Sequence, residues 1–445
     1  MAQGLSQCLS QHPLKLCSQM HSMAAPQPIG PVHGPALRSA LQGSTQGAAL
    51  PAPAVSEVPM QPTAAVAPLL ASSAWVLGAA AGSRAARRRR AAAGRPSGRA
   101  AVVVMAVGGV DCVGIVGCSG AVGKEMLKCL EERSFPTKTV RLFAKRAAGT
   151  EVDTKFGKVT IEPFSVEAAQ ECDIVLMAVS GGFSEEFSPK IIGGPKNTAV
   201  IDNSSAFRYK DDIPLVVPEI NGGEKSASPL IANPNCTTAI GAMALWPLHQ
   251  KFKLKKVLMS TYQAASGAGA EGMAELEEGL AAYVKDGEVS KPEVFAHQLP
   301  FNVIPQIDAF QENGYTKEEM KVTWELQKIF GLPKDVKVSC TAVRVPTLRA
   351  HSESITVETE LPISAEEARK VLSSAPGVEV VDDPASLKYP MPLNATGQAD
   401  VQVGRLRQSI VFGDHGLEFF VSGDQLLRGA ALNAVIIAEQ AVATR

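Results

Sequence analysis

The sequence has no C-x-x-C pair among its eight cysteines and no residue spacing that is typical of metal ligands. We therefore expect free thiols in a reducing compartment, rather than a disulfide framework or a bound metal. An excess of charge is also missing, since 43 basic residues balance 44 acidic residues, which argues against a nucleic-acid partner. The length of 445 residues and a hydrophobic content of 45% predict two or three domains with a sizeable core.

Acidic residues are nearly absent from the first hundred positions, where nine Lys and Arg accompany a single acid, Glu57. This segment is rich in Ala, Ser, Gln and Pro, which is typical of an organellar transit peptide. It cannot bury enough apolar surface to offset the entropy of ordering, so we predict a disordered targeting leader over residues 1–106. We expect the plastid (chloroplast stroma) as its destination, with the mitochondrion or the cytoplasm as alternatives, and a mature start between Ala100 and Gly109.

The most apolar stretch of this leader is short and covers residues 66–82, VAPLLASSAWVLGAAAG. An arginine cluster follows it, so a membrane anchor with a positive flank is one interpretation. The run contains Pro68 and consists largely of Ala and Ser, which makes it marginal for spanning a bilayer. We favour a removable leader and expect no membrane association of the mature form. A basic tail that binds nucleic acid is a weaker alternative.

The residues after the leader have the pattern of a nucleotide-binding fold. A strand-like run over residues 112–116 passes through three glycines into a helical pattern. Glycines in a tight turn let the backbone approach a pyrophosphate, which then lies at the helix N-terminus. The spacing G-x-x-G-x-x-G is one residue looser than the usual dinucleotide fingerprint. The residues of this turn that we predict to bind the cofactor are Gly117, Ser119, Gly120, Ala121, Val122 and Gly123.

The second predicted strand, in TVRLFAK, ends at Lys145 and Arg146, where NAD-binding folds usually carry an acid for the ribose. Cations at this position favour the 2′-phosphate of NADP, although a solvated surface pair is the alternative. Further strand-like runs alternate with a helix expected near residues 183–192, which predicts an α/β fold with a mostly parallel sheet. Ser180 and Gly181 follow one of these strands at the edge where ligands bind, so we add them to the cofactor site.

The segment ANPNCTTA places Cys236 after an Asn-Pro-Asn turn, at the start of a small-residue run with a helical pattern. Most free cysteines are small buried hydrophobes, and that interpretation stays open from this segment alone. A helix N-terminus and a nearby imidazole both stabilise a thiolate, so a nucleophile is the alternative. In either case we expect Thr237 and Thr238 to cap the helix.

Three further polar residues are candidates for the same site. His351 has polar neighbours, so a buried structural role is not obvious for it. If residues 338–346 form one strand and residues 351–359 its neighbour, Arg344 and His351 face the same cleft. Arg208 follows another predicted strand. Two arginines near a thiol suggest a substrate with two anionic ends, although surface exposure is the default for any arginine.

Taken together, these segments resemble the aspartate-semialdehyde dehydrogenase family over roughly residues 110–442. The motifs occur in the family's order and read GIVGCSGAVGKEM, IDNSSAFR, ANPNCTTA, TYQAASGAGA, FNVIPQIDAF, YTKEEMK, VRVP, AHSES and RGAALNA. The resemblance implies NADPH-dependent conversion of L-4-aspartyl phosphate to L-aspartate 4-semialdehyde and phosphate through a cysteine thioester. It also implies a homodimer and a place in the biosynthesis of lysine (through diaminopimelate), threonine, methionine and isoleucine.

The resemblance assigns roles to the matching residues. Cys236 is the nucleophile, His351 is the general acid and base, and Gln263 orients the acyl group beside the thiol. Arg344 binds the substrate carboxylate. The residues that the family adds at the cofactor are Ser266, Gly267 and Asn433.

Arg208 and Lys321 bind phosphate in the family, with Asn235 close to that site. Glu318 contacts the substrate amino group. Without the family, Glu318 and Lys321 at a spacing of i, i+3 on a predicted helix would be interpreted as a surface salt bridge.

Two positions depart from the family. Ala147 stands where many relatives have Ser, and Ile436 stands where we expect a Gln near the nicotinamide end of the cofactor. We expect both departures to affect cofactor affinity rather than the activity itself.

Two other functions stay open at this point. N-acetyl-γ-glutamyl-phosphate reductase shares the thioester chemistry, but its nucleophile segment usually reads Asn-Pro-Gly-Cys followed by Tyr. A catalytically silent NADP-binding redox protein, in which Cys236 is merely oxidisable, has no need for Gln263, Arg344 and His351 together.

We therefore predict an α/β protein with two folded domains. A Rossmann-like NADP-binding domain covers residues 107–235 and is completed by residues 424–445. A catalytic and dimerisation domain of the α+β type, with a mainly antiparallel sheet, covers residues 236–423.

Overall fold

The computed structural model describes residues 109–444, which belong to one compact unit. The leader predicted for residues 1–106 lies outside the described residues. Within the described range, no helix is both long enough and apolar enough to cross a membrane.

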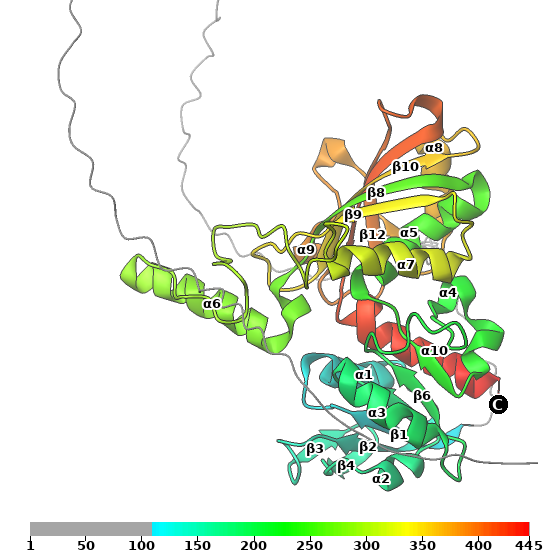
Figure 1. The fold of residues 1–445 in the computed structure, drawn as a ribbon, viewed down its shortest axis with the longest axis vertical. Coiled ribbons are helices and arrows are strands. Elements are labelled where there is room, and N and C mark those ends of the chain that lie inside the picture. The colour runs from blue at the N-terminus through cyan, green and yellow to red at the C-terminus, as the bar shows by residue number, and fades with distance from the viewer. Residues whose placement is uncertain (1–108, 445) are drawn as a thin grey trace, which may run out of the picture. The chain divides into compact units, whose positions relative to one another are not determined.

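A five-stranded parallel sheet forms the first half of the fold (Figure 1). Its order is β2 (Thr137–Phe143), β1 (Val110–Val116), β5 (Ile174–Met177), β6 (Ala199–Asp202) and β7 (Leu230–Ala232). Every pairing is parallel, and β5, β6 and β7 are fully buried, as the continuous apolar runs predict. The α/β class with a parallel nucleotide-binding sheet is confirmed.

Helices cover both faces of this parallel sheet. On one face, α1 (Ala121–Glu132) and the C-terminal α10 (Leu432–Ala443) share a core with alternate residues of the strands, such as Val113 and Ile115. On the other face lie α2 (Val166–Gln170) and α3 (Gly181–Ile192). A small hairpin of β3 (Glu151–Thr154) and β4 (Gly157–Thr160) follows β2.

A six-stranded mixed sheet forms the second half. Its order is β11 (Val378–Val380), β12 (Val401–Gln408), β13 (Gly416–Gly423), β10 (His351–Thr359), β8 (Leu254–Tyr262) and β9 (Lys337–Thr341). The central pairings are antiparallel, and the two edge pairings are parallel. The expectation that residues 338–346 and 351–359 are neighbouring strands is wrong, because β9 ends at Thr341 and β8 lies between β9 and β10.

One face of the mixed sheet packs against α5 (Cys236–Phe252), α7 (Lys317–Phe330) and α8 (Ala365–Ser373). Burial alternates along β8, and its outward side chains include Leu258 and Tyr262, which are 46% and 40% exposed. Two short helices, α4 (Pro218–Asn221) and α9 (Pro392–Ala395), lie in the connections.

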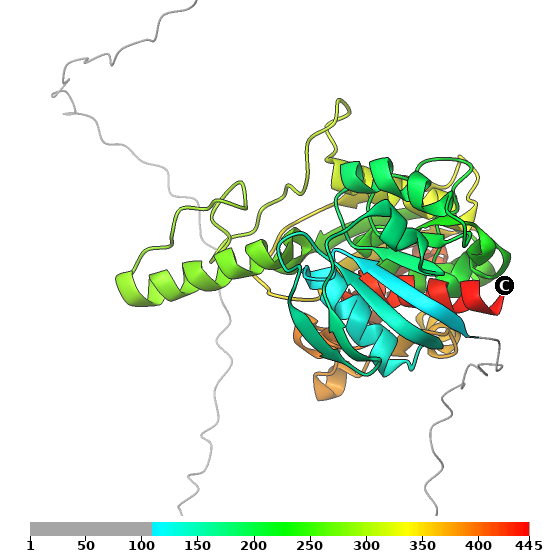
Figure 2. The same cartoon turned by 90° about the horizontal axis from the view of Figure 1, so that it is seen from below.

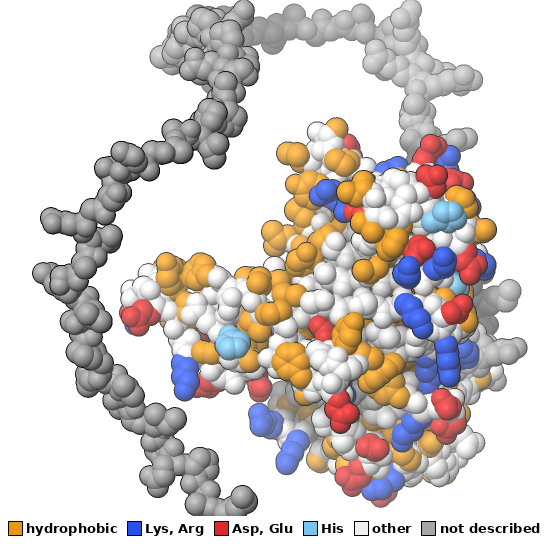
Figure 3. All heavy atoms as spheres, turned by 45° about the horizontal axis from the view of Figure 1, so that its top comes forward, with side chains coloured by type: hydrophobic (Ala, Val, Ile, Leu, Met, Phe, Trp, Pro, Cys, Tyr) orange, Lys and Arg blue, Asp and Glu red, His pale blue; other side chains and the backbone are white. Residues whose placement is uncertain are grey.

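The helix α6 (Gly269–Asp286) projects from the rest of this unit, as both ribbon views show (Figures 1 and 2). The core that it shares with the following segment is small and contains Leu276, Leu299 and Ile304. Val284 of this helix and Phe301 of the following segment are exposed, at 86% and 66%. Figure 3 shows hydrophobic side chains on the surface of the projecting part. Exposed apolar surface of this kind is typical of a surface that meets another protein.

Candidate active site

A cleft of about 430 Å³ opens where the carboxyl ends of β6 and β7 meet the start of α5. In a doubly wound sheet, this edge is where ligands bind. The predicted site residues that line the cleft are Val122, Arg208, Asn235, Cys236, Gln263, Ser266, Gly267, Glu318, Lys321 and Arg344.

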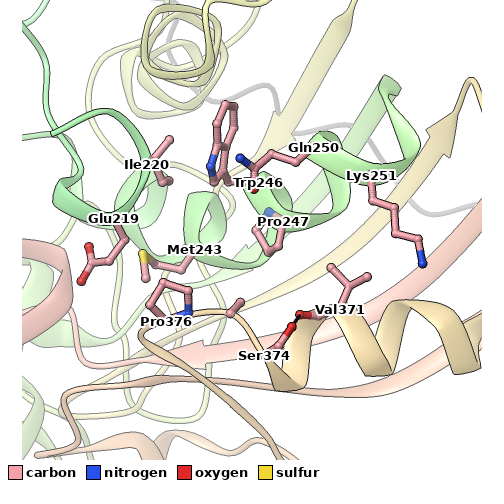
Figure 4. Close-up of a pocket in the computed structure, with 11 residues that line it drawn as sticks. Glu219, Ile220, Met243, Trp246, Pro247, Gln250, Lys251, Val371, Ser374 and Pro376 are labelled. Carbon is pink, nitrogen blue, oxygen red and sulfur yellow. Dashed lines mark hydrogen bonds between the residues drawn. The ribbon is translucent and has the colours of Figure 1, made fainter. Parts of the chain in front are cut away.

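A second cavity, of about 510 Å³, lies behind α5 between α4 and α8 (Figure 4). Trp246 and Met243 form its apolar wall, and the carboxylate of Glu219 stands at one end. That carboxylate already accepts two hydrogen bonds from Arg428, at 2.8 and 2.9 Å. None of the residues that line this cavity is a predicted site residue, so the smaller cleft is the candidate active site.

Cys236 is the first residue of α5 and faces the cleft. Of the six cysteines that the structure describes, five are buried and Cys236 alone is partly exposed. The side chain of Asn235 caps the helix by accepting a hydrogen bond from the Thr238 N–H at 3.2 Å. The prediction that threonines cap this helix is wrong, because the hydroxyls of Thr237 and Thr238 point into the interior without a partner among the described residues.

The surroundings of Cys236 favour the protonated form of its thiol. Burial raises its pKa to about 11, and the negative charge of Glu318 acts in the same direction. The positive charges of Arg208 and Arg344 oppose this effect without overcoming it. A ligand that neutralises Glu318 would therefore make the thiol easier to ionise.

His351 is fully buried at the start of β10. Its Nδ1 accepts a hydrogen bond from the Ala264 N–H at 3.0 Å, so the neutral ring carries its proton on Nε2. Nε2 has no hydrogen-bond partner within residues 109–444. A Cβ at Gly267 would lie 3.3 Å from Nε2, so the Nε2–H faces the glycine turn that lines the cleft. Burial, helped by the charge of Arg344, lowers the pKa of His351 to about 3.

The residue before His351 holds the ring in place. Ala350 has a left-handed backbone with φ of 68°, which is strained for a residue with a Cβ. Its N–H donates to Oε1 of Gln425 at 2.8 Å, and the amide nitrogen of Gln425 contacts the Ser266 hydroxyl. Sequence reasoning missed Ala350 and Gln425, because a left-handed backbone at an alanine leaves no local signal.

Glu318 is the centre of a buried polar network. Its Oε1 accepts hydrogen bonds from the side-chain amides of Asn235 at 2.9 Å and Gln263 at 3.2 Å. Its Oε2 pairs with Nζ of Lys321 at 2.9 Å, and Lys321 also reaches Asp308 at 2.9 Å. The side chains of Glu318 and Lys321 are only 7% and 14% exposed, so this pair is not a surface salt bridge. Burial opposes ionisation of Glu318, but Lys321 and the hydrogen bonds hold its pKa below the usual value.

The two arginines of the site are buried rather than solvated, and each is 6% exposed. The Nε of Arg208 donates to the Asn233 carbonyl at 2.8 Å. The Nη1 of Arg344 donates to the Ala264 carbonyl at 2.8 Å, which ties it to the loop that orients His351. Burial lowers the pKa of Arg344, although Glu318 opposes that effect. Buried guanidinium groups in one cleft with a lysine suit an anionic ligand.

Glu325 is a member of this site that sequence reasoning missed. It is fully buried on α7, and its Oε2 accepts a hydrogen bond from the Asn235 N–H at 2.6 Å. Its Oε1 pairs with Nη1 of Arg208 at 3.2 Å, and burial raises its pKa. Glu325 lies two helical turns after Glu318, and this i, i+7 spacing on one helix face is the signal that could have identified it.

The glycine turn between β1 and α1 has the shape that the cofactor prediction requires. Gly117 has φ of 85°, and a Cβ there would lie 2.2 Å from the Ala178 carbonyl oxygen. A Cβ at Gly123 would lie 2.3 Å from the Gly117 carbonyl oxygen. In the described part of the chain no side chain caps α1, so its first N–H groups are available to a phosphate. These features fit a pyrophosphate at this turn.

The remaining predicted cofactor residues fall into two groups. Lys145 and Arg146 are exposed after the end of β2, and Ser180 is exposed at the N-terminus of α3, which begins at Gly181. Asn433 is fully buried and does not line the cleft, because its amide donates to the Val216 carbonyl at 3.0 Å and to Asn233 at 2.6 Å. The two departures from the family, Ala147 and Ile436, both pack against the core beneath α1 and α10.

Comparison with known proteins gives consistent results. A sequence model described as the NAD binding domain of semialdehyde dehydrogenase matches residues 112–227, and one described as its dimerisation domain matches residues 245–428. The aspartate-semialdehyde dehydrogenase of Aquifex aeolicus is 45% identical over 332 residues, which span 74% of this chain and 96% of that protein. The corresponding protein of Synechocystis is 41% identical over 329 residues, with coverage of 74% and 96%.

A solved structure shows a similar fold. Aspartate semialdehyde dehydrogenase II from Vibrio cholerae, complexed with ASA, matches with a TM-score of 0.71 and 38% sequence identity. The match covers 75% of this chain and 98% of that one.

Proposed function

This chain belongs to the aspartate-semialdehyde dehydrogenase family, and from that membership we propose how its own residues carry out the family's reaction. The protein is an NADP-dependent phosphorylating oxidoreductase that converts L-4-aspartyl phosphate to L-aspartate 4-semialdehyde in amino-acid biosynthesis. The observation that carries the residue assignment is a partly exposed Cys236 at a helix N-terminus, in one cleft with Arg208, Lys321 and Arg344.

The substrate binds with its charged groups at the charged side chains of the cleft. Arg208 and Lys321 hold the phosphate, and Arg344 holds the α-carboxylate. The substrate ammonium pairs with Glu318 and thereby offsets the negative charge that raises the pKa of Cys236. Substrate binding thus activates a thiol that is otherwise protonated.

Cys236 then attacks the acyl carbon. The new C–S bond forms as the C–O bond to the phosphate breaks, and the thiol proton leaves with the phosphate. Gln263 is held by Glu318 beside the thiol, where it orients the acyl group. NADPH, when bound at the Gly117–Gly123 turn, supplies the hydride that reduces the thioester carbon.

His351 stabilises negative charge on the acyl oxygen. Its Nε2–H has no partner among residues 109–444 and lies against Gly267, which lines the cleft. A donor in a buried site is most effective where charge develops in the transition state. Collapse of the oxyanion expels the Cys236 thiolate, which takes one proton from solvent. In this scheme His351 donates a hydrogen bond and need not give up its proton.

The experiment that tests the function follows NADP reduction with aspartate semialdehyde and inorganic phosphate, using protein that begins at Val107. Omitting phosphate should abolish turnover, and NAD should be a poor substitute for NADP. N-acetylglutamate semialdehyde is the control substrate for the rival reductase. A preference for that control substrate would contradict the proposed function.

Cys236→Ser is the matching variant. We expect it to lower turnover by more than about 1000-fold, because a serine hydroxyl in this cleft is a far weaker nucleophile. Binding of NADP, measured by titration calorimetry, should not change, since Cys236 lies outside the glycine turn. Turnover like that of the unsubstituted protein would exclude the thioester mechanism.

The proposal extends to assembly and location. The match to a dimerisation domain supports a homodimer, and the exposed apolar side chains along β8 and α6 offer surface for it. The acid-poor, arginine-containing first hundred residues support import into the plastid stroma and removal of the leader there. Protein that begins at Val107 should fold and remain active, and an insoluble truncated protein beside active full-length protein would contradict this assignment.

A further inference from the structure

Two buried thiols lie in contact at the end of the parallel sheet that is remote from the catalytic cleft. Cys112 is on β1, Cys172 immediately precedes β5, and their Sγ atoms are 3.5 Å apart. The two side chains are 7% and 0% exposed, and both belong to the core between the sheet and α2. Neither residue touches the site described above, so the catalytic reaction does not explain the pair.

We propose that Cys112 and Cys172 are a modification site, at which a hydroperoxide converts the two thiols into a reversible disulfide within the chain. The position of Cys172 supports this pairing. It precedes β5, outside the regular strand, and its sulfur packs on the face of β1 that carries Cys112, since a Cβ at Gly114 would lie 3.0 Å from the Cys172 Sγ. The two Sγ atoms, 3.5 Å apart, need to approach by only about 1.5 Å to reach the S–S bond length, which side-chain rotation can supply.

The surroundings give the two sulfurs different roles. The contact with Cys172, 3.5 Å away, lowers the pKa of Cys112 to about 7, with Thr139 and Arg141 acting in the same direction. The same contact and burial raise the pKa of Cys172. Cys112 is also the more exposed of the two side chains, at 7% against 0%, so we assign it as the thiolate that attacks an oxidant and Cys172 as the thiol that resolves the product.

The chemistry balances in two steps. The Cys112 thiolate attacks one peroxide oxygen, the O–O bond breaks, and Cys112 sulfenic acid forms as hydroxide leaves. Cys172 then loses its proton, its sulfur attacks the sulfenic sulfur, and the S–O bond breaks with release of a second hydroxide, which takes up a proton. The first hydroxide takes up the proton that Cys112 lost on ionisation, so with hydrogen peroxide two thiols are oxidised, one peroxide is reduced and two molecules of water result. A dithiol reductant reverses the change by thiol–disulfide exchange.

The position of the pair determines the consequence. Cys112 lies near the amino end of β1, whereas the cleft is at the carboxyl ends of the strands. A disulfide there closes a loop of 60 residues between β1 and β5, so it stabilises the nucleotide-binding sheet without obstructing the site. Cys236 is more exposed than this pair, but burial raises its pKa to about 11, so little of it is present as the reactive thiolate. Oxidation should reach the Cys112 and Cys172 pair first.

The test treats full-length protein with increasing hydrogen peroxide, blocks remaining thiols by alkylation and maps peptides by mass spectrometry. We expect a linked Cys112–Cys172 peptide at doses that leave turnover unchanged. The melting temperature should rise by several degrees and return after dithiothreitol. Loss of turnover while both cysteines can still be alkylated would overturn the proposal, as would an oxidised protein that melts no higher than the reduced one.

Three variants separate the two sulfurs from general oxidation. Cys172→Ser should accumulate a sulfenic acid at Cys112 that a 1,3-diketone probe captures, whereas Cys112→Ser should give no such adduct at Cys172. Cys129→Ser is the matched control, because Cys129 is also buried in this domain and its pKa is raised to about 12. It should form the disulfide like the unsubstituted protein. Equal probe capture at both positions would contradict the assigned roles.

Discussion

At the scale of single residues, protonation decides what each catalytic group can do. The Ala264 N–H occupies Nδ1 of His351, and the edge of the ring with Cε1 and Nε2–H lies against Gly267, which lines the cleft. A neutral ring held in this way donates a hydrogen bond but has no free lone pair for the Cys236 proton. The acid–base role that the family resemblance assigns to His351 therefore becomes a donor role in our proposal.

Substitution of His351 by Gln tests this role directly, because a glutamine amide donates a hydrogen bond but is not a base. We expect His351→Ala to lower kcat by roughly 100-fold to 1000-fold, as for loss of an oxyanion donor. His351→Gln should retain at least about ten times the activity of His351→Ala. The measurement is steady-state NADPH oxidation by both variants. Equal losses would indicate that His351 must transfer a proton.

Part of the residue scale could be predicted from the sequence. The nucleophile Cys236 stands after a distinctive Asn-Pro-Asn turn, and a helix N-terminus is a local property. The protonation states could not be predicted, because they depend on burial and on charged residues of other elements. For Cys236, that residue is Glu318 of α7.

At the scale of elements, α7 supplies two buried glutamates, Glu318 and Glu325, to the floor of the active site. Glu318 accepts hydrogen bonds from the side chains of Asn235 and Gln263. Glu325 forms an ion pair with Arg208 and accepts a hydrogen bond from the Asn235 N–H. The helix is fixed at its start by a capping box between Thr316 and Glu319, with both partners present. This arrangement orients the substrate-binding arginine and the N-cap of α5 together.

Removal of the Glu325 carboxylate should destabilise the protein strongly. Glu325→Ala leaves Arg208 as a buried charge without its partner and leaves the Asn235 N–H unpaired, a change that costs about 3–5 kcal/mol in comparable sites. Urea unfolding measures the free energy of unfolding of both proteins, and we expect it to be lower by this amount in Glu325→Ala. Glu366→Ala on the exposed face of α8 removes a solvated ion pair and is the control, for which we expect no change. A stable Glu325→Ala protein would contradict the buried pairing.

Sequence patterns located most elements but not their partners. Continuous apolar runs identified the buried strands of the parallel sheet, and the helix expected near residues 183–192 is α3, Gly181–Ile192. The neighbour of β10 was predicted wrongly, because residues adjacent in the chain need not pair in a mixed sheet, and β8 inserts from far upstream. The helix cap was misassigned because a threonine hydroxyl and an asparagine amide look equally suitable in sequence.

At the scale of the whole molecule, the two halves are joined next to the active site. Arg349 precedes the His351 strand and bonds Glu125 of α1 at 2.7 Å and Asp424 at 2.8 Å. Asp424 lies where the chain leaves the mixed sheet for α10. Through Arg349, α1, which begins at the glycine turn, is connected to the segment that leads into His351. The same ion pairs therefore position residues of the cofactor site and of the catalytic site.

Cofactor choice is expected to depend on the exposed pair after β2. The double variant Lys145→Ala and Arg146→Ala should weaken NADPH binding by about 10-fold to 100-fold, since two charge-assisted contacts to the 2′-phosphate are lost. Affinity for NADH should change little. Titration of both cofactors measures the ratio, and Lys155→Ala, an exposed lysine after β3, is the control. An unchanged ratio would show that the pair is only solvated surface charge.

Burial of His351 also predicts how stability depends on pH. The pKa of His351 is about 3 in the folded protein, below the usual 6.5. Between these two pH values the unfolded chain therefore binds up to one more proton than the folded chain. The associated stability is fully present above pH 6.5 and is lost as pH falls, at about 1.4 kcal/mol per pH unit. His351→Gln should reduce this slope by nearly one proton between about pH 4 and 5.5, and by about half a proton at pH 6.5. Glu325 and Glu353, whose pKa values are raised, act oppositely but equally in both proteins, so the comparison isolates His351.

The sequence by itself determined the chemistry that depends on local order. It supplied the glycine turn, the cysteine at a helix start, the cations after β2 and the parallel α/β pattern, because each is set by residues that are neighbours in the chain. The tertiary structure alone decided which groups meet: Glu325 with Arg208, Ala264 with His351, and the Cys112 and Cys172 thiols across 60 residues. Such contacts fix protonation and reactivity through burial and nearby charge, and those are properties of the packed fold.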